Sequence, residues 1–236
     1  MKFNGKTLSV AAEFSGGGEA YYDEFWDVVQ ENGERTDYSY GFCHSTWTDA
    51  IFRPKYDIKP KQANYMFTQS AITDLQAALD RAGVVLDFSG VGNLYITRVF
   101  DGSKITRVGT IDISHVTQTN TFFAGANALQ TIDLLRVAAD GATQFGANMF
   151  QGCTKLENIT IDGMLDTNID LSMCPLSVDS MKSIILHLKS SGGDERTIKL
   201  SQDCWQKLDA AGGQPDGDSW SEYVEAYLGW TAEYVA

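Results

Sequence analysis

The stretch that decides the fold runs from Phe123 to Ile161, because it contains the same pattern twice. Residues 123–134 read Phe-Ala-Gly-Ala-Asn-Ala-Leu-Gln-Thr-Ile-Asp-Leu, and residues 150–161 read Phe-Gln-Gly-Cys-Thr-Lys-Leu-Glu-Asn-Ile-Thr-Ile. Phe, Gly, Leu, Ile and a final aliphatic residue occupy the same offsets in both copies, which begin 27 residues apart. A repeat of roughly 20–50 residues is typical of a solenoid, whose units bury their apolar faces against one another.

Two looser copies of the pattern precede this pair. Phe67 and Phe100 each begin a stretch in which aliphatic residues follow five and eight positions later. The four Phe residues are separated by 33, 23 and 27 residues, so we expect degenerate units that carry insertions. The sequence therefore predicts an irregular α/β solenoid, in which short parallel strands stack on one side and helices and loops lie on the other.

The second copy resembles one unit of the BspA-like leucine-rich repeat of bacterial surface antigens, Ala-Phe-x-x-Cys-x-x-Leu-x-x-Ile-x-Ile-Pro. The resemblance covers residues 65–203 and has three departures: no Pro follows Ile161, Ala126 stands where the family has Cys, and the spacing is irregular. It implies a right-handed leucine-rich-repeat coil with one short strand per turn. It also implies a binding or adhesion module of a bacterial surface or of a bacteriophage structural protein.

Three N-terminal segments resemble uncharacterised proteins of gut-bacterial phages and prophages. They are residues 22–27 (Tyr-Asp-Glu-Phe-Trp-Asp), residues 32–37 (Asn-Gly-Glu-Arg-Thr-Asp) and the aromatic stretch 47–60, in which Pro54 and Pro60 favour an extended backbone. This resemblance implies that the protein is made in the bacterial cytoplasm and located in a virion. The bacterial cell surface is the alternative location.

The chain is expected to have three regions: an N-terminal helical and aromatic cap over residues 1–62, the solenoid over residues 63–203, and a C-terminal cap over residues 204–236. In the first region, apolar residues at helical spacing predict a helix over residues 19–32. In the last, residues 203–210 and 219–228 are predicted helices, and residues 230–235 a closing strand. Solenoid ends require caps, since the terminal coil would otherwise expose its core.

The composition limits the classes of partner. The chain has a net charge of −13 and a pI near 4.5. Binding to nucleic acid or to anionic lipid requires clustered Lys and Arg, so we expect neither partner. No apolar run approaches the ~18 residues of a membrane span. The apolar patch at residues 8–14 is too short and too polar for a secretory signal, and a virion component needs none.

Five segments are predicted to be the strands of the coils: residues 84–88, 111–113, 132–134, 159–161 and 197–200. Helices are predicted over residues 73–82 and 177–189. Side chains alternate across a strand, so the aliphatic residues point into the coil. The residues between them point outward and form our candidate binding surface, which consists of Asp87, Asp112, Asp133, Thr160 and Lys199.

No motif predicts a metal or a cofactor. Asp166, Asn168 and Asp170 match the start of a calcium loop, but Leu171 and Ser177 stand where that loop needs Gly and Glu. The three His residues lack metal-ligand spacing, and the four Cys residues form no Cys-x-x-Cys pair. We expect reduced thiols, with one of them, at position 153, in a small buried site of the repeat.

The repeat and the lack of a catalytic motif favour a non-enzymatic binding or structural module. The leading interpretation is a tail or receptor-binding protein of a phage or prophage virion, whose partner is a protein or a cell-surface glycan. A bacterial adhesion domain is the first alternative. The second is a glycan-acting enzyme that uses a carboxylate pair such as Asp112 and Asp133. No heptad pattern predicts a coiled coil, but the sequence leaves a homo-oligomer open.

Overall fold

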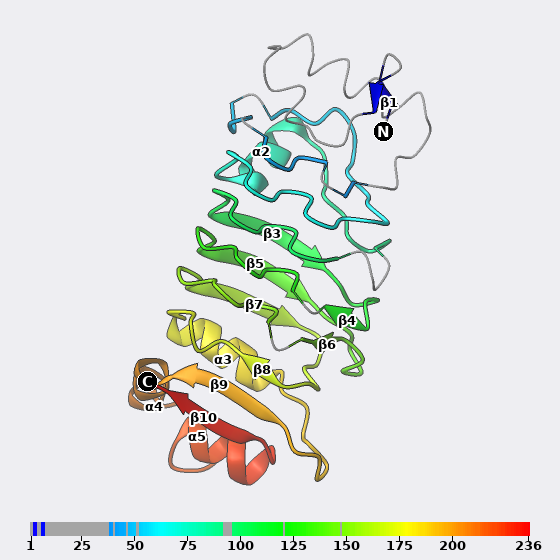
Figure 1. Ribbon diagram of the computed structural model, residues 1–236. Coiled ribbons are helices and arrows are strands. Elements are labelled where there is room, and N and C mark those ends of the chain that lie inside the picture. Colours follow the sequence, from blue (N-terminus) through cyan, green and yellow to red (C-terminus); the bar gives the residue numbers. More distant parts are fainter. Residues whose placement is uncertain are drawn as a thin grey trace.

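Short parallel strands stack along one axis in the computed structural model of the chain (Figure 1). The structure describes residues 2–3, 6–7, 38–39, 41–45, 47–50, 52–91, 96–119, 121–146 and 148–236. The helix predicted over residues 19–32 lies outside these ranges. Over the described coils the architecture is a β-solenoid with a few helices, so the stacking of parallel strands inferred from the repeat is confirmed.

Parallel pairing joins strands of successive coils into three sheets among the described residues. The first sheet has the order β3 (Arg107–Asp112), β5 (Thr131–Arg136), β7 (Asn158–Asp162). The second pairs β4 (Gln118–Thr119) with β6 (Gln144–Phe145), and the third has the order β8 (Ile169–Asp170), β9 (Thr197–Ser201), β10 (Thr231–Val235). A separate antiparallel pair consists of β1 (Lys2–Phe3) and β2 (Lys6–Thr7).

The two best copies of the repeat lie side by side. Ile132 on β5 is the direct partner of Ile159 on β7, and both side chains are buried. The prediction that Leu134 points inward was wrong, because Leu135 is the buried residue that pairs with Ile161. Strand β5 holds one more residue than β7 between its buried positions, and the pairing shifts register there.

Residues 84–88 are described and form no strand, so the strand predicted there was wrong. This segment forms one isolated parallel bridge, between Leu86 and Ile58. The predicted C-terminal strand is present as β10. The helices predicted over residues 73–82, 177–189 and 203–210 are present with ends that differ by a few residues, and the one predicted over residues 219–228 is a short α-helix followed by a π-helix.

A column of Phe rings runs through the core with one ring per coil, and we call it the Phe column. Consecutive rings of Phe67, Phe100, Phe123 and Phe150 stack at centroid distances of 5.7, 5.6 and 5.5 Å, with interplanar angles of 1°, 10° and 8°. Phe42 extends the column at 5.1 Å from Phe67. It therefore begins a further unit, which the sequence analysis missed.

The backbone turns the same corner two residues after each Phe of the column. The residue there has a φ between 54° and 83° in all five coils: His44, Gln69, Gly102, Gly125 and Gly152. This left-handed region favours glycine, which explains the Phe-x-Gly motif of the repeat. At these corners, backbone N–H groups donate to carbonyls of the following coil, for example Gly125 to Gln151 at 2.7 Å.

Two helices take the place of strands on either side of the first sheet. Helix α2 (Leu75–Ala82) lies in the coil before β3, and helix α3 (Val178–Leu186) lies in the coil after β7 (Figure 1). The side chain of Asp74 caps the N-terminus of α2, and that of Ser177 caps α3. The sheet is therefore flanked by a helix at each edge.

Helix α3 satisfies the backbone at the edge of β7. The hydroxyl oxygens of Ser180 and Ser183 accept hydrogen bonds from the backbone N–H groups of Ile159 and Ile161, at 2.8 and 2.9 Å. An unpaired strand edge is a template for association with another chain, so covering it with a helix removes that site.

The C-terminal region contains helix α4 (Gln202–Ala211), the short helix α5 (Trp220–Glu222), the π-helix η2 (Tyr223–Tyr227) and strand β10. Trp205, Trp220 and Trp230 are buried here, and each indole N–H donates to a backbone carbonyl. Buried residues from Tyr38 to Ala232 form one continuous core. None of the described helices has the length and apolar character that crossing a membrane requires.

Candidate binding surface

The outward side chains of β3, β5 and β7 form one solvent-facing surface between α2 and α3, which we call the outer face. The three strands place ten side chains on it, two of them consecutive at the register shift of β5, while the residues between them enter the core. They are Arg107, Thr110, Asp112, Thr131, Asp133, Leu134, Arg136, Asn158, Thr160 and Asp162.

Ion pairs across the strands dominate the outer face. Arg107 forms a bidentate pair with Asp133, with N–O distances of 3.0 and 2.7 Å. Arg136 lies between its two strand partners, at 3.3 Å from Asp112 and 2.9 Å from Asp162. All these side chains are substantially exposed, so the pairs fix side-chain positions more than they stabilise the fold.

The ionisation of the outer face follows from these pairs. Burial raises the pKa of Asp112, but hydrogen bonds from the Ser114 hydroxyl and backbone N–H and from Arg136 lower it further, and the pKa is below its ordinary value. Hydrogen bonds that the guanidinium groups donate to their partner carboxylates raise the pKa of Arg107 and of Arg136. Asp112 is therefore a carboxylate at neutral pH.

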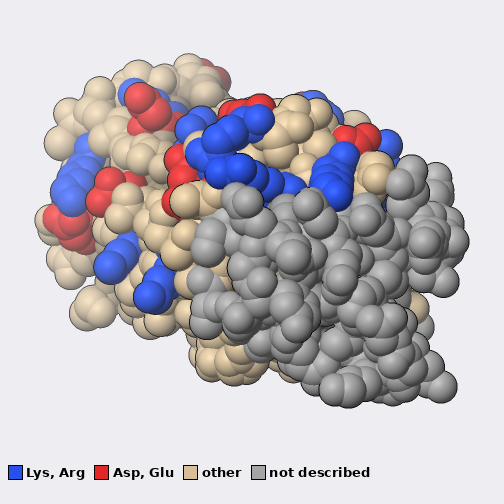
Figure 2. Space-filling view, turned by 90° about the horizontal axis from the view of Figure 1, so that it is seen from above, with Lys and Arg blue, Asp and Glu red and all other residues tan. Residues whose placement is uncertain are grey.

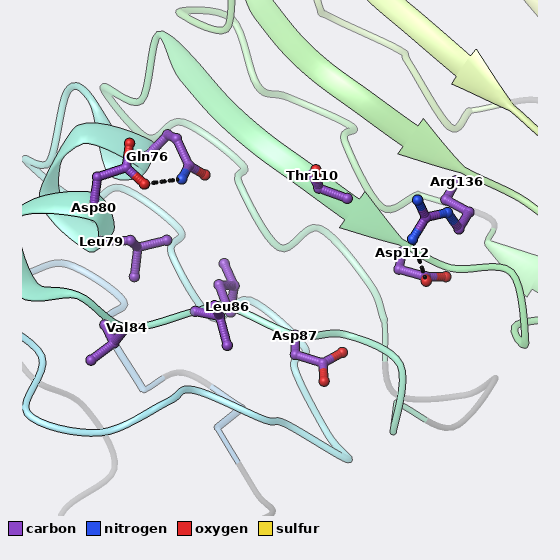
Figure 3. Close-up of a pocket in the computed structure, with 10 residues that line it drawn as sticks. Gln76, Leu79, Asp80, Val84, Leu86, Asp87, Thr110, Asp112 and Arg136 are labelled. Carbon is purple, nitrogen blue, oxygen red and sulfur yellow. Dashed lines mark hydrogen bonds and ion pairs between the residues drawn. The ribbon is translucent and has the colours of Figure 1, made fainter.

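A hollow of about 370 Å³ lies where α2 and residues 84–87 meet the outer face (Figure 3). Leu79, Val84, Val85 and Leu86 give it an apolar wall. Its remaining lining is polar and comprises Gln76, Asp80, Asp87, Thr110, Asp112 and Arg136. In Figure 3 the carboxylate of Asp80 lies on the α2 side, those of Asp87 and Asp112 lie on the other side, and apolar side chains lie between them.

A second hollow, of about 260 Å³, lies at the opposite edge of the sheet, beside the N-terminus of α3. Strands β5 and β7 contribute Asp133, Asn158 and Thr160 to its lining, and α3 contributes Asp179 and Ser180. Hydroxyl, amide and carboxylate groups therefore dominate this hollow, in contrast to the apolar wall of the hollow beside α2.

The structure places four of the five candidate residues that the sequence selected in the two hollows, two in each. Asp87 and Asp112 line the hollow beside α2, while Asp133 and Thr160 line the hollow beside α3. Lys199 lies apart from them on β9 of the third sheet, where its ammonium group is 3.0 Å from the carboxylate of Glu233.

Several surface residues were missed by the sequence analysis. The arginines of the outer face, Arg107 and Arg136, were not selected, although a signal for one of them exists. Asp112, Arg136 and Asp162 each follow the last buried aliphatic residue of their strand. The alternation of Asp, Arg and Asp at this position of successive strands would have predicted the ion pairs between them.

The residues of the calcium-loop motif have other roles in the structure. Asp166 pairs with Lys189 at 3.0 Å and with Arg196. Asn168 accepts a hydrogen bond from the backbone N–H of Thr197 at 2.9 Å. Within the described ranges, no group of three or more His, Cys, Asp or Glu side chains could hold a metal ion.

All four cysteines are free and buried. The thiol of Cys153 donates to the carbonyl oxygen of Phe123 in the preceding coil, at 3.2 Å. Burial raises the pKa of Cys153 to about 12 and also raises that of Cys43 and Cys174. The thiols of Cys43, Cys153 and Cys174 therefore lack the lowered pKa of a reactive cysteine.

Charge is distributed unevenly along the solenoid. Residues 38–110 contain eight Lys and Arg against six Asp and Glu, whereas residues 111–236 contain seven against 17. Figure 2 views the molecule from the end at which α2 lies and shows blue basic side chains next to red acidic ones. Most of the net negative charge therefore comes from the part of the chain after β3.

Comparisons of the chain with protein-family models, with curated proteins and with solved structures found no match. The candidate surface is therefore defined by its residues and geometry alone.

Proposed function

We propose that this protein is a non-enzymatic binding or structural module that holds a partner against the outer face. The observation that carries the proposal is the combination of a fixed polar sheet surface with a hollow at each of its edges. Ion pairs hold the side chains of the sheet in place before a partner arrives, which lowers the entropic cost of binding.

The proposal includes a more specific identity for the fold. The coil is of the BspA-like leucine-rich-repeat type, and the N-terminal and C-terminal regions act as caps. The Phe-x-Gly corners and the thiol of Cys153 at the Cys position of the repeat support this assignment. Three buried tryptophans after residue 203 support the C-terminal cap, because the region that contains them, with α4, α5 and β10, lies at one end of the stack (Figure 1).

The proposed setting is the virion of a phage or prophage, in a tail or receptor-binding role, and the partner is a protein or a cell-surface glycan. The resemblance of the N-terminal segments to phage proteins supports this setting. Mass spectrometry of purified virions tests it, and we expect the protein among the particle components. Its absence from virions together with its presence on intact bacterial cells would favour the adhesion domain instead.

A glycan-acting enzyme is less well supported by the geometry. A carboxylate pair that hydrolyses glycosides needs one member that holds a proton. Asp112 has a lowered pKa and is paired with Arg136, while Asp133 is paired with Arg107. Both side chains are therefore engaged as anions, which favours binding over acid–base chemistry.

Binding at the outer face is tested with two display formats, a glycan array and a random peptide library. Each is probed with the unchanged protein and with Thr160→Trp, which places a large ring on the exposed surface of β7. Gln206→Trp is the matched control, because residue 206 is exposed on α4, outside the outer face. We expect Thr160→Trp to abolish the signal and the control to retain it. Equal loss in both, or in neither, contradicts the proposal.

A further inference from the structure

The hollow beside α2 carries more negative than positive charge. Asp80, Asp87 and Asp112 contribute three carboxylates to its lining, and Arg136 contributes one guanidinium. That guanidinium already contacts two carboxylates, those of Asp112 and of Asp162 outside the hollow. The one positive charge of the lining is therefore already paired with carboxylates of the sheet.

The carboxylates of Asp80 and Asp87 accept hydrogen bonds from uncharged donors. The side-chain amide of Gln76 donates to Asp80 at 2.6 Å, and the backbone N–H of Ser89 donates to Asp87 at 2.8 Å. Each carboxylate can accept further hydrogen bonds, since its two oxygens provide about four acceptor sites. A cation that enters the hollow would therefore meet two carboxylates that no basic side chain of the described residues pairs with.

The wall between these carboxylates is apolar. Leu79 is buried, Val84 and Leu86 are partly buried, and Val85 leaves 52% of its surface exposed at the rim. An exposed apolar wall next to carboxylates matches a ligand with an aliphatic stem and a positive tip. Lysine and arginine side chains have this construction, and they commonly lay their stems along apolar surface.

The size and charge of the hollow exclude other classes of occupant. Its volume of about 370 Å³ is at the lower end of the ~300–1,000 Å³ of ligand pockets, which suits one long side chain with its backbone. Phosphates and acidic glycans would be repelled by the three carboxylates. The lining also contains no aromatic ring on which a sugar could stack.

We propose that the hollow beside α2 receives a lysine or arginine side chain that a partner protein presents. The aliphatic stem lies on Val84, Val85 and Leu86, and the cation reaches a carboxylate at one end of this apolar wall, that of Asp80 or that of Asp87. This inference rests on the proposed function, because it names the partner class for one end of the outer face.

The test selects binders from a random displayed peptide library against the full chain. We expect enrichment of Lys or Arg beside aliphatic residues. A selected peptide is then titrated by fluorescence anisotropy, together with a version in which norleucine replaces the basic residue. The norleucine version should bind at least about tenfold more weakly. Added salt should weaken the binding of the basic peptide, since exposed charges are screened.

Three variants locate the site. The double variant Asp80→Asn and Asp87→Asn should weaken the basic peptide by about tenfold, because exposed ion pairs are individually weak and the variant removes both carboxylates. Val85→Lys should abolish binding, since it supplies the hollow with a cation of the chain itself. Asp179→Asn is the control for the loss of a carboxylate elsewhere, because it removes one from the hollow beside α3. Unfolding midpoints verify that all variants are folded.

The outcomes separate the inference from the proposed function. Peptides without basic residues, or basic peptides that tolerate the double variant, overturn the inference. If glycans bind and Thr160→Trp abolishes that signal while no basic peptide is selected, the inference fails and the proposed function stands. If neither library yields a binder that responds to Thr160→Trp or to the double variant, both fail.

Discussion

The Phe column and the outer face are parts of the same coils, yet they differ in how they vary from coil to coil. The column repeats one ring and one left-handed corner five times. The outer face repeats no side chain in this way and changes from Thr to Leu to Thr along its centre, at Thr110, Leu134 and Thr160. Stacked coils must fit each other inside, whereas the outside must only remain compatible with water and with a partner. The inside therefore specifies the fold, and the outside is free to specify binding.

The largest expected effect comes from breaking the column. Phe123 is fully buried between the rings of Phe100 and Phe150. Phe123→Ala should lower the free energy of unfolding by about 3–5 kcal/mol, because it removes buried apolar surface and leaves a cavity. Denaturant unfolding measures this change. Tyr227→Ala, at a half-exposed ring of η2, is the control and should cost much less. A loss below about 1 kcal/mol for Phe123→Ala would show that the column does not hold the coils together.

A smaller effect is expected at the corners of the coils. Gly125 has a φ of 78°, and a Cβ there would overlap the carboxylate of Asp101 in the coil before. Gly125→Ala should cost about 1–2 kcal/mol, the penalty of a left-handed conformation for an L-residue. Gln69 already accepts this strain at a φ of 54°, so Gln69→Gly should be nearly neutral or slightly stabilising. Equal costs for the two changes would contradict the corner as the reason for the glycine.

The smallest effect is expected on the outer face and depends on pH. The pKa of Asp112 is lowered in the folded chain, so its contribution to stability is present above its ordinary value of 3.8 and is lost as the pH falls below it. Thermal unfolding at neutral and at acidic pH measures the loss. Asp112→Asn should reduce the difference between the two midpoints, whereas Asp216→Asn, in an exposed loop, should preserve it. An unchanged difference in Asp112→Asn would mean that the Asp112 pair does not persist in solution.

The same comparison explains what could be predicted from the sequence. The Phe, Gly and aliphatic offsets predicted the stacking and the pairing of Ile132 with Ile159, since core positions must repeat. Leu134 was assigned to the core because Leu134 and Leu135 are identical and adjacent. The sequence therefore does not show that β5 has one extra residue before its second buried position. Phe42 was missed because Trp47 and Ala50 stand five and eight positions after it, where the two looser copies of the repeat have Ile, Leu or Val.

The candidate site was less accessible from the sequence than the fold. Alternation along the strands found Asp112, Asp133 and Thr160, because a short strand fixes which side chains point outward, whereas Asp87 lines a hollow although its segment forms no strand. The hollows themselves depend on where α2 and α3 pack against the sheet edges. Helical periodicity predicts that such helices exist, but it contains no information on how far they stand out from a neighbouring sheet.

The stacking of successive coils in register creates the outer face, and a disulfide crosslink tests it most directly. Thr131 on β5 and Asn158 on β7 are direct partners, and both side chains point outward. The double variant Thr131→Cys and Asn158→Cys should form a disulfide on mild oxidation, detected by mass spectrometry, while the four buried native thiols stay reduced. The offset pair Thr131→Cys and Asp162→Cys should not crosslink. Equal crosslinking of both pairs, or crosslinking of the offset pair alone, would contradict the register on which the outer face depends.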